Sequence, residues 1–195
     1  ANSRLYVERS IKDEFVGKLI ARAEAMQPGD PLDPASKMGA IVDERQTEGI
    51  LRFIDAGRDT ADLVAGGERI KIDGKGCFVQ PTIFDNVSHD DPLARDEIFG
   101  PVLSVIPFDS EEQALAMAND SIYGLAASVW TDNLSRACRV ADSLQVGTVS
   151  VNTVDALSAQ TPFGGMKQSG FGRDLSLHSL DKYTALKTTW IKYKS

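Results

Sequence analysis

The stretch RDEIFGPVLSVIPF, residues 95–108, combines a core element with residues that a core does not need. Its second half, Val102–Phe108, is apolar at almost every position, which is typical of a strand buried in a sheet. Just before it stand a carboxylate, Glu97, and an aromatic ring, Phe99, and the step Gly100-Pro101 then restricts the backbone. The stretch therefore predicts a core strand that is preceded by a candidate binding site.

Strands and helices alternate on both sides of this stretch. Strands are predicted at residues 4–8, 62–67, 76–87, 102–108, 124–131, 147–152 and 184–194, and helices at 10–26, 43–60, 109–121, 132–144 and 175–183. Such alternation predicts an α/β fold in which crossover helices join the strands of a mostly parallel sheet. The last strand is expected to pair outside its own domain, so the chain is divided into residues 1–182 and a terminal strand region, 183–195.

Two local signals refine these elements. Ser10 is expected to cap the first helix. The apolar side of that helix is expected to consist of Ile11, Phe15, Leu19, Ile20 and Ala23. Pro81 cannot donate a backbone hydrogen bond, which favours an edge strand or a bulge within residues 76–87.

The composition excludes several classes of partner. The 195 residues are 42% hydrophobic and 25% charged, with a formal net charge of −7. An acidic chain repels phosphate backbones, so nucleic acid is not expected as a partner. No apolar run approaches the roughly 20 residues of a membrane span, and no signal peptide is visible, so a cytoplasmic location is expected. The chain begins at Ala1 without a Met, which we interpret as an internal cut.

The cysteines and histidines are too few and too scattered to predict a metal site. Cys77 and Cys138 lie far apart, and the only histidines are His89 and His178, whereas a zinc site needs about four convergent ligands. Free thiols in a reducing compartment are the simplest interpretation. Cys138 falls within an amphipathic helix and is expected to behave as a small core residue.

In an open α/β sheet, ligands bind beyond the carboxyl ends of the strands. Two segments are expected there: residues 95–101 and the glycine-rich loop PFGGMKQSGFGR, residues 162–173, which follows the strand 147–152. From spacing alone a structural loop is the favoured interpretation of residues 162–173. The loop matches neither the P-loop nor the dinucleotide-binding glycine pattern.

Several segments resemble the aldehyde dehydrogenase superfamily in their order and spacing. They are EIFGPVL (97–103), YGLAASVWT (123–131), GTVSVN (147–152) and PFGGMKQSGFGRD (162–174), together with DPLDPASKMGAIVDERQ (30–46) and GCFVQPTIFDNV (76–87). Residues 172–191 look most like the bacterial γ-glutamyl-γ-aminobutyraldehyde dehydrogenases of putrescine breakdown. The resemblance covers the whole chain.

The resemblance implies part of an NAD-dependent oxidoreductase, with NADP left open, that oxidises an aliphatic or amino-aldehyde to the acid through a cysteine thioester. In the family the nucleophilic cysteine, the general-base glutamate and the dinucleotide-binding domain precede the segment that this chain matches. The resemblance therefore implies that the nucleophile and the general base lie upstream of Ala1, and no catalytic residue is assigned within the chain. By itself the chain is expected to be inactive and not to bind the cofactor tightly.

By the same resemblance, Glu97 binds the hydroxyls of the nicotinamide ribose and Phe99 packs beside the nicotinamide. A carboxylate can accept from both hydroxyls of a ribose diol, and an aromatic ring offers an apolar face to a planar heterocycle. Without the family, the residues favour a plainer role, in which Glu97 pairs with Arg95 or caps the strand.

The resemblance also places Phe163, Asp155 and Leu157 in the wall of the aldehyde tunnel. Many relatives carry an aromatic residue where Leu157 stands, and the smaller side chain would widen the tunnel. For Phe163, a core aromatic that packs the loop is an equally good interpretation. Asn152 is expected to organise the loop that follows its strand, and Arg173 to tie backbone carbonyls together.

A non-catalytic assembly module that retains the fold is the alternative function. In the family the last strand extends a sheet shared with another subunit, which implies a homo-oligomer formed through residues 183–195. The other expected partner is a small aldehyde substrate. The choices between dimer and tetramer, and among aldehydes, stay open.

Overall fold

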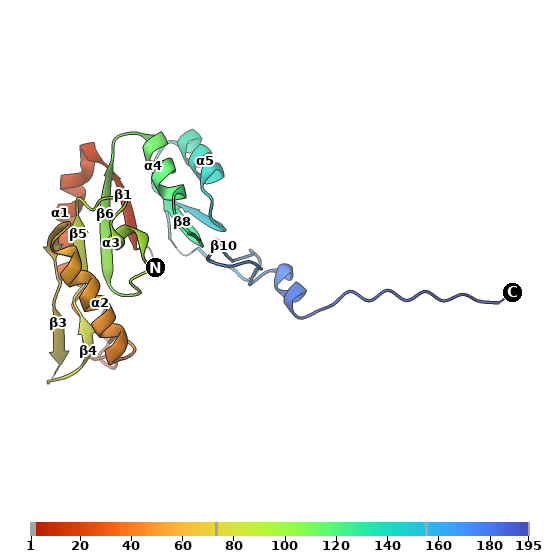
Figure 1. Cartoon of the computed structure of the whole chain (residues 1–195), viewed down its shortest axis with the longest axis horizontal. Helices are drawn as coiled ribbons and strands as arrows, with labels where there is room; N and C mark the ends of the chain where they lie inside the picture. The colour runs from red at the N-terminus through yellow and green to blue at the C-terminus, as the bar shows by residue number, and fades with distance from the viewer. Residues whose placement is uncertain (1–2, 73, 155, 195) are drawn as a thin grey trace. The chain divides into compact units, whose positions relative to one another are not determined.

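Four strands form a mixed sheet in the order β1-β6-β5-β2 (Figure 1). They are β1 (Arg4–Glu8), β2 (Asp62–Ala65), β5 (Thr82–Asp85) and β6 (Val102–Phe108). Strand β6 runs parallel to both of its neighbours, β1 and β5, whereas β2 is antiparallel to β5. The computed structural model describes residues 3–72, 74–154 and 156–194. The α/β fold with mainly parallel strands, predicted from the sequence, is confirmed.

Helices cover both faces of this sheet. Successive side chains of a strand point to opposite faces, and β5 and β6 carry apolar residues on both, so each face needs a cover. Helix α1 (Lys12–Glu24) covers one face, where its Val16 and Ala23 share a buried cluster with Val7, Ile83 and Val105. Helices α2 (Glu44–Gly57) and α3 (Pro92–Arg95) cover the other. The core on that side includes Ile50, Ile54, Phe84, Leu93, Ile98, Val102 and Ile106.

The start of α1 differs from the prediction. Ser10 does not cap the helix, because its hydroxyl donates to the Glu8 carboxylate at 3.0 Å. A short 3-10 turn, η1 (Arg9–Ile11), precedes α1 instead. A β-branched residue, Ile11, occupies the N-cap position and supplies no side-chain acceptor.

The buried side of α1 matches the prediction only in the second half of the helix. Ile11 and Phe15 are exposed, whereas Lys12 and Val16 are buried. Leu19, Ile20 and Ala23 pack in the cluster beneath the helix, as predicted. The Lys12 ammonium lies 2.6 Å from an Asp85 carboxylate oxygen on β5. This ion pair turns Lys12 toward the sheet, so Ile11 and Phe15 point to solvent.

Residues 76–87 form two strands of different sheets. Strand β4 (Lys75–Val79) pairs with β3 (Arg69–Ile72) in an antiparallel hairpin that the sequence did not predict. Pro81 lies between β4 and β5. The predicted interruption is confirmed, but an edge position is wrong for β5, which lies inside the sheet order. Pro81 belongs to neither strand, so its missing backbone donor does not interrupt the hydrogen bonding of a sheet.

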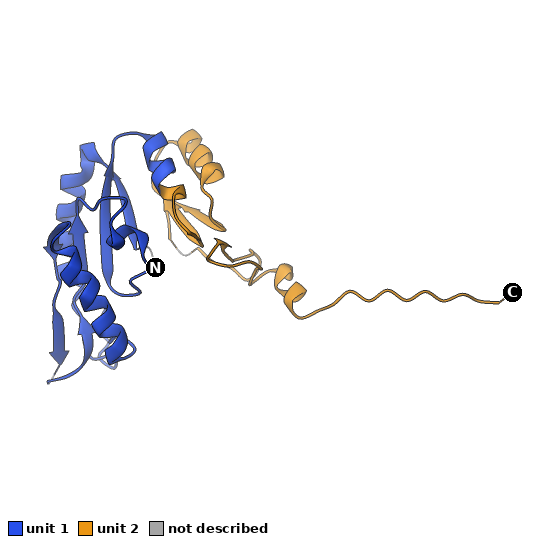
Figure 2. Cartoon of the chain, in the orientation of Figure 1, with its two compact units in different colours: residues 1–117 blue, residues 118–195 orange. Residues whose placement is uncertain are grey.

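The chain divides into two compact units, residues 1–117 and 118–195 (Figure 2). The second unit holds β8 (Ala126–Val129), α5 (Leu134–Ser143) and β9 (Thr148–Val151), with β8 and β9 parallel. It also holds the antiparallel pair β7 (Tyr123–Gly124) and β10 (Met166–Lys167), and the 3-10 helix η2 (Leu177–Lys182). Helix α4 (Glu111–Asn119) crosses the division. The predicted boundary at residue 182 stays a prediction.

One prediction for the second unit is wrong, since Cys138 is exposed on α5 and is not a core residue. Residues 184–194 form neither helix nor strand within the chain and are exposed throughout. Their pairing with another subunit stays a prediction. Among the residues described, no helix is long and apolar enough to span a bilayer.

We predict that Lys12→Met destabilises the chain by about 3 kcal/mol, because it leaves the Asp85 carboxylate buried without its cation. Both side chains of this pair are only 10% exposed. The pair Lys18–Glu14, in which both side chains are 75% exposed, provides the control. Lys18→Met should cost much less, because water already screens this exposed pair. Urea unfolding measures both, and equal losses would show that burial of the Lys12 pair does not matter.

Candidate functional site

Glu97 and Phe99 lie in the loop that joins α3 to β6, at the amino end of β6. The amide of Thr82, at the start of the parallel strand β5, donates to the carbonyl of Pro101 at 2.8 Å. The expectation that residues 95–101 lie beyond the carboxyl ends of the strands is therefore wrong. The loop enters the sheet at the opposite end because it leads into β6 and does not follow it.

Both side chains point to solvent. Phe99 is 77% exposed, and Glu97 is exposed as well. Within the residues that the structure describes, Glu97 forms no hydrogen bond or ion pair, and Arg95 donates to Asp90 at 3.0 Å. The plainer interpretation, a pair between Glu97 and Arg95, is thus not found. A carboxylate and an aromatic ring two residues apart are available to a ligand.

The backbone beneath these two side chains is held firmly. Ile98 is buried in the core, and a Cβ placed on Gly100 would lie 2.6 Å from atoms of Ile50 on α2. Only glycine allows so close an approach of helix and loop. The side-chain amide of Gln46, also on α2, donates to two carbonyls of the loop. Gln46 was missed by the sequence interpretation, since a polar residue in the first turn of a helix is ordinary.

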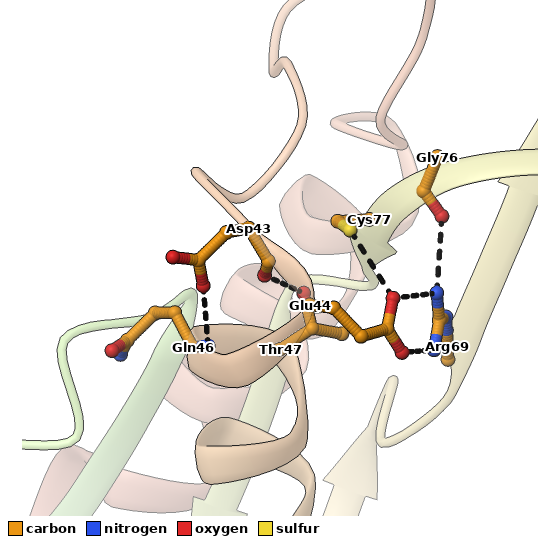
Figure 3. A network of polar contacts seen from close by, with 7 residues as sticks. All are labelled: Asp43, Glu44, Gln46, Thr47, Arg69, Gly76 and Cys77. Carbon is orange, nitrogen blue, oxygen red and sulfur yellow. Dashed lines mark hydrogen bonds and ion pairs between the residues drawn. The ribbon is translucent and has the colours of Figure 1, made fainter.

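The first turn of α2 is itself fixed by a polar network (Figure 3). The Asp43 carboxylate caps the helix by accepting a hydrogen bond from the backbone amide of Gln46 at 2.7 Å. The Thr47 hydroxyl donates to the backbone carbonyl of Asp43 at 2.8 Å. In Figure 3 the side chains of Glu44 and Gln46 extend to opposite sides of this turn. One helix end thus reaches two neighbouring segments.

On the Glu44 side, this network ties α2 to the β3–β4 hairpin. Arg69 donates to both carboxylate oxygens of Glu44 and to the Gly76 carbonyl, and the Cys77 thiol donates to Glu44 at 3.5 Å (Figure 3). The hydrogen bond from Arg69 holds the pKa of Glu44 below its ordinary value of 4.5. Cys77 therefore has a structural contact, which gives it a role without catalysis.

The predicted tunnel residues lie in the second unit. Leu157 is 51% exposed, and Phe163 is half-buried, with its backbone amide and carbonyl both bonded to Asp174. Asp155 lies outside the described residues. Ala1, upstream of which the nucleophile and the general base are expected, also lies outside them. The placement of those two catalytic groups therefore stays a prediction.

Asn152 contacts a different segment from the one expected. Its side chain binds Thr131, accepting from the backbone amide at 2.9 Å and donating to the carbonyl at 3.0 Å. Thr131 lies in the segment after β8, whereas the prediction was the loop after β9. Because β8 and β9 are parallel neighbours, the carboxyl ends of both strands lie close enough for this contact.

The glycine-rich loop after β9 is tied together by side chains that bind its backbone. Arg173 donates to the carbonyls of Gly165 at 2.9 Å and Gly172 at 2.6 Å, which confirms its predicted role. Lys167 donates to two carbonyls that follow one another closely at the end of α4, those of Asn119 and Ser121. The loop follows the carboxyl end of β9, as predicted.

Comparison with known proteins assigns the chain to a family. Residues 1–189 match the Aldehyde dehydrogenase family. The chain belongs to the aldehyde dehydrogenase family. The resemblance identified from its motifs is confirmed.

Individual aldehyde dehydrogenases are similar over almost the whole chain. The NADP/NAD-dependent aldehyde dehydrogenase PuuC of Escherichia coli K12 is 48% identical over 195 residues. The crystal structure of the γ-glutamyl-γ-aminobutyraldehyde dehydrogenase of Burkholderia cenocepacia is 55% identical over 96% of the chain, with a TM-score of 0.93. The indole-3-acetaldehyde dehydrogenase AldA of P. syringae, in a complex with NAD+, is 54% identical over 98% of the chain, with a TM-score of 0.94.

The chain spans well under half of these aldehyde dehydrogenases. It covers 39% of the E. coli and P. syringae proteins and 38% of the B. cenocepacia protein. What a complete aldehyde dehydrogenase does is therefore not assigned to these residues by similarity alone.

We predict that Glu44→Gln destabilises the chain at neutral pH and has little effect in acid. The folded pKa of Glu44 lies below its ordinary value of 4.5. The stabilisation by Arg69 is thus complete above pH 4.5 and disappears as the pH falls through the folded pKa. Urea midpoints of both proteins between pH 3 and pH 7 measure this. A difference that persists unchanged at pH 3 would contradict the assignment to the ionised Glu44.

Proposed function

We propose that this chain supplies the nicotinamide-ribose clamp, and one wall of the aldehyde tunnel, of an NAD(P)-dependent aldehyde dehydrogenase. The observation that carries the proposal is the pair of exposed side chains, Glu97 and Phe99, on a backbone held by α2 and β6. A ligand that needs both a hydrogen-bond acceptor and an apolar face finds them two residues apart. Nicotinamide and its ribose have this combination of groups.

The residues present fit this cofactor. The Glu97 carboxylate has acceptor capacity for two hydroxyl donors, and no group in the described ranges competes for it. The exposed Phe99 ring can cover a planar heterocycle without first leaving a packed core. When bound, NAD supplies the hydride acceptor for aldehyde oxidation. Glu97 then orients the ribose, and Phe99 excludes water from the face of the ring that it covers.

The reaction needs groups that we do not assign to this chain. In the proposed chemistry a cysteine thiolate adds to the aldehyde carbon, loss of hydride to the cofactor leaves a thioester, and water releases the acid. Cys138 is exposed on α5 and Cys77 is engaged with Glu44, and neither follows the nucleophile's motif. We therefore propose that the nucleophile and the general base belong to a segment upstream of Ala1, and we expect the chain alone to be inactive.

We further propose an aliphatic or amino-aldehyde as the substrate, with Phe163, Leu157 and Asp155 contributing to the tunnel. Similar enzymes are named for γ-glutamyl-γ-aminobutyraldehyde and for indole-3-acetaldehyde. These aldehydes differ widely in polarity. The similarity to PuuC makes putrescine breakdown the first pathway to test.

We predict that this chain alone produces no NADH from a short aliphatic aldehyde, whereas the protein encoded by its whole gene does. The comparison separates an enzyme from the alternative, an assembly module that retains the fold. If the whole gene product is silent with every aldehyde tried, the assembly module becomes the better explanation. Turnover by the chain alone would overturn the assignment of the nucleophile to another segment.

In the whole gene product, Glu97→Gln should raise the KM for NAD about tenfold and leave the KM for the aldehyde unchanged. The substitution keeps the shape but removes the charge from hydrogen bonds that are among the stronger ones in proteins. Glu24→Gln, at the exposed end of α1, is the matched control. An unchanged KM for NAD in Glu97→Gln would overturn the ribose clamp.

The C-terminal segment is proposed to mediate homo-oligomer formation. Residues 184–194 are exposed throughout and include Leu186, Trp190, Ile191 and Tyr193. Their backbone donors and acceptors are open to pairing with a strand of a second copy. Strand addition would give this segment the regular structure that it does not have within the chain.

We predict that replacing Lys187 and Thr189 together with proline makes the chain monomeric. Each proline removes a backbone donor and opposes strand pairing, while the apolar side chains of the segment remain. Replacing the same two residues with alanine is the control and should leave self-association intact. Light scattering measures both. Equal association of the two variants would show that pairing by this segment is not responsible.

A further inference from the structure

The loop before β6 contains a backbone conformation that needs an explanation. Phe99 has a φ of +55°, in the left-handed region that bulky residues rarely occupy. Such a conformation is unfavourable for a residue with a bulky side chain. Burial of the ring does not compensate for it, because Phe99 is 77% exposed. Contacts of the surrounding backbone must therefore hold this residue.

Gln46 makes the contacts that act directly on Phe99. Its Nε2 donates to the carbonyl oxygen of Ile98 at 3.1 Å and to that of Phe99 at 3.2 Å. The first carbonyl belongs to the peptide before the Phe99 Cα, and the second to the peptide after it. One amide group thus fixes both peptide planes, and with them both φ and ψ of Phe99.

The neighbouring residues hold the ends of the loop but not its centre. Ile98 is anchored in the core, and Gly100 lies against Ile50. The Gly100 carbonyl accepts from the Val102 amide at 2.8 Å, at the start of β6. These contacts limit how far the loop can move. The two peptides that flank Phe99 are held by the hydrogen bonds from the Gln46 side chain.

Gln46 is well placed to act as a fixed support. Its own backbone amide is bonded to the Asp43 cap at 2.7 Å, and Figure 3 shows it in the first turn of α2. The helix behind it is anchored by Ile50 and Ile54, which are both fully buried. A side chain that extends from a rigid helix end sets the positions of the atoms that it binds more precisely than one that extends from a loop.

We propose that Gln46 is a positioning residue of the cofactor site, which sets the directions of Glu97 and Phe99 through the main chain. The inference rests on the proposed function, in which these two side chains receive the nicotinamide ribose and its ring. Without the Gln46 amide, Phe99 relaxes out of the left-handed region. The peptides on either side then rotate, and the two side chains no longer present one preorganised surface.

The first test is solution NMR of this chain with Gln46→Met, which keeps the length of the side chain and removes its donors. Backbone scalar couplings of Phe99 should show that φ has left the left-handed region, and the Val102 amide should exchange about tenfold faster. Gln27→Met is the control, since the Gln27 side-chain amide donates to the Ala23 carbonyl at the end of α1 and not to the loop before β6 among the described residues. Retention of the left-handed φ in Gln46→Met would overturn the proposal.

The second test is kinetic and uses the whole gene product. Gln46→Met should raise the KM for NAD several-fold without changing the KM for the aldehyde, whereas a merely structural role would change the two together or neither. If Glu97→Gln raises the KM for NAD but Gln46→Met does not, the positioning role is wrong. If neither variant changes it, the proposed function fails. The NMR result then separately decides whether Gln46 controls Phe99.

Discussion

The contact between Ile50 of α2 and Gly100 at the entrance to β6 determines how the site is built. Because a Cβ at Gly100 would lie 2.6 Å from Ile50 atoms, helix and loop approach as closely as a glycine permits. That approach brings the first turn of α2 within reach of the loop. The Gln46 amide can then bind two loop carbonyls, while Ile50 fills the core beneath. The contact between Ile50 and Gly100 thus determines both the packing of the core and the geometry of the candidate site.

The same helix end also holds the β3–β4 hairpin, through a different kind of interaction. Glu44 and Arg69 form a charged pair that is partly open to solvent, so salt and acid weaken it. Gln46 makes neutral hydrogen bonds to carbonyls, which do not depend on pH. The hairpin therefore meets α2 through a charged pair, whereas the loop with Glu97 and Phe99 meets it through neutral hydrogen bonds.

Much of the fold follows from local patterns in the sequence. The apolar run of residues 102–108 is a central strand, and the spacing of Ile50 and Ile54 gives the buried side of α2. Local patterns do not decide an element whose outcome depends on a distant partner. Asp85 draws Lys12 inward at the start of α1, although no pattern within α1 indicates this. Residues 184–194 have the composition of a strand, but a strand forms only where another segment accepts its hydrogen bonds.

The site divides in the same way. Glu97 and Phe99 could be proposed as cofactor contacts because they stand in a motif, EIFGP, that resembles the family's. Gln46 could not, because it acts on backbone atoms 52 and 53 positions away, and any residue provides a carbonyl. Arg173 and Asn152 likewise act on backbone groups in the second unit. A side chain that binds backbone atoms of a loop can do so whatever residues the loop contains. The sequence of the loop therefore does not indicate which side chain binds it.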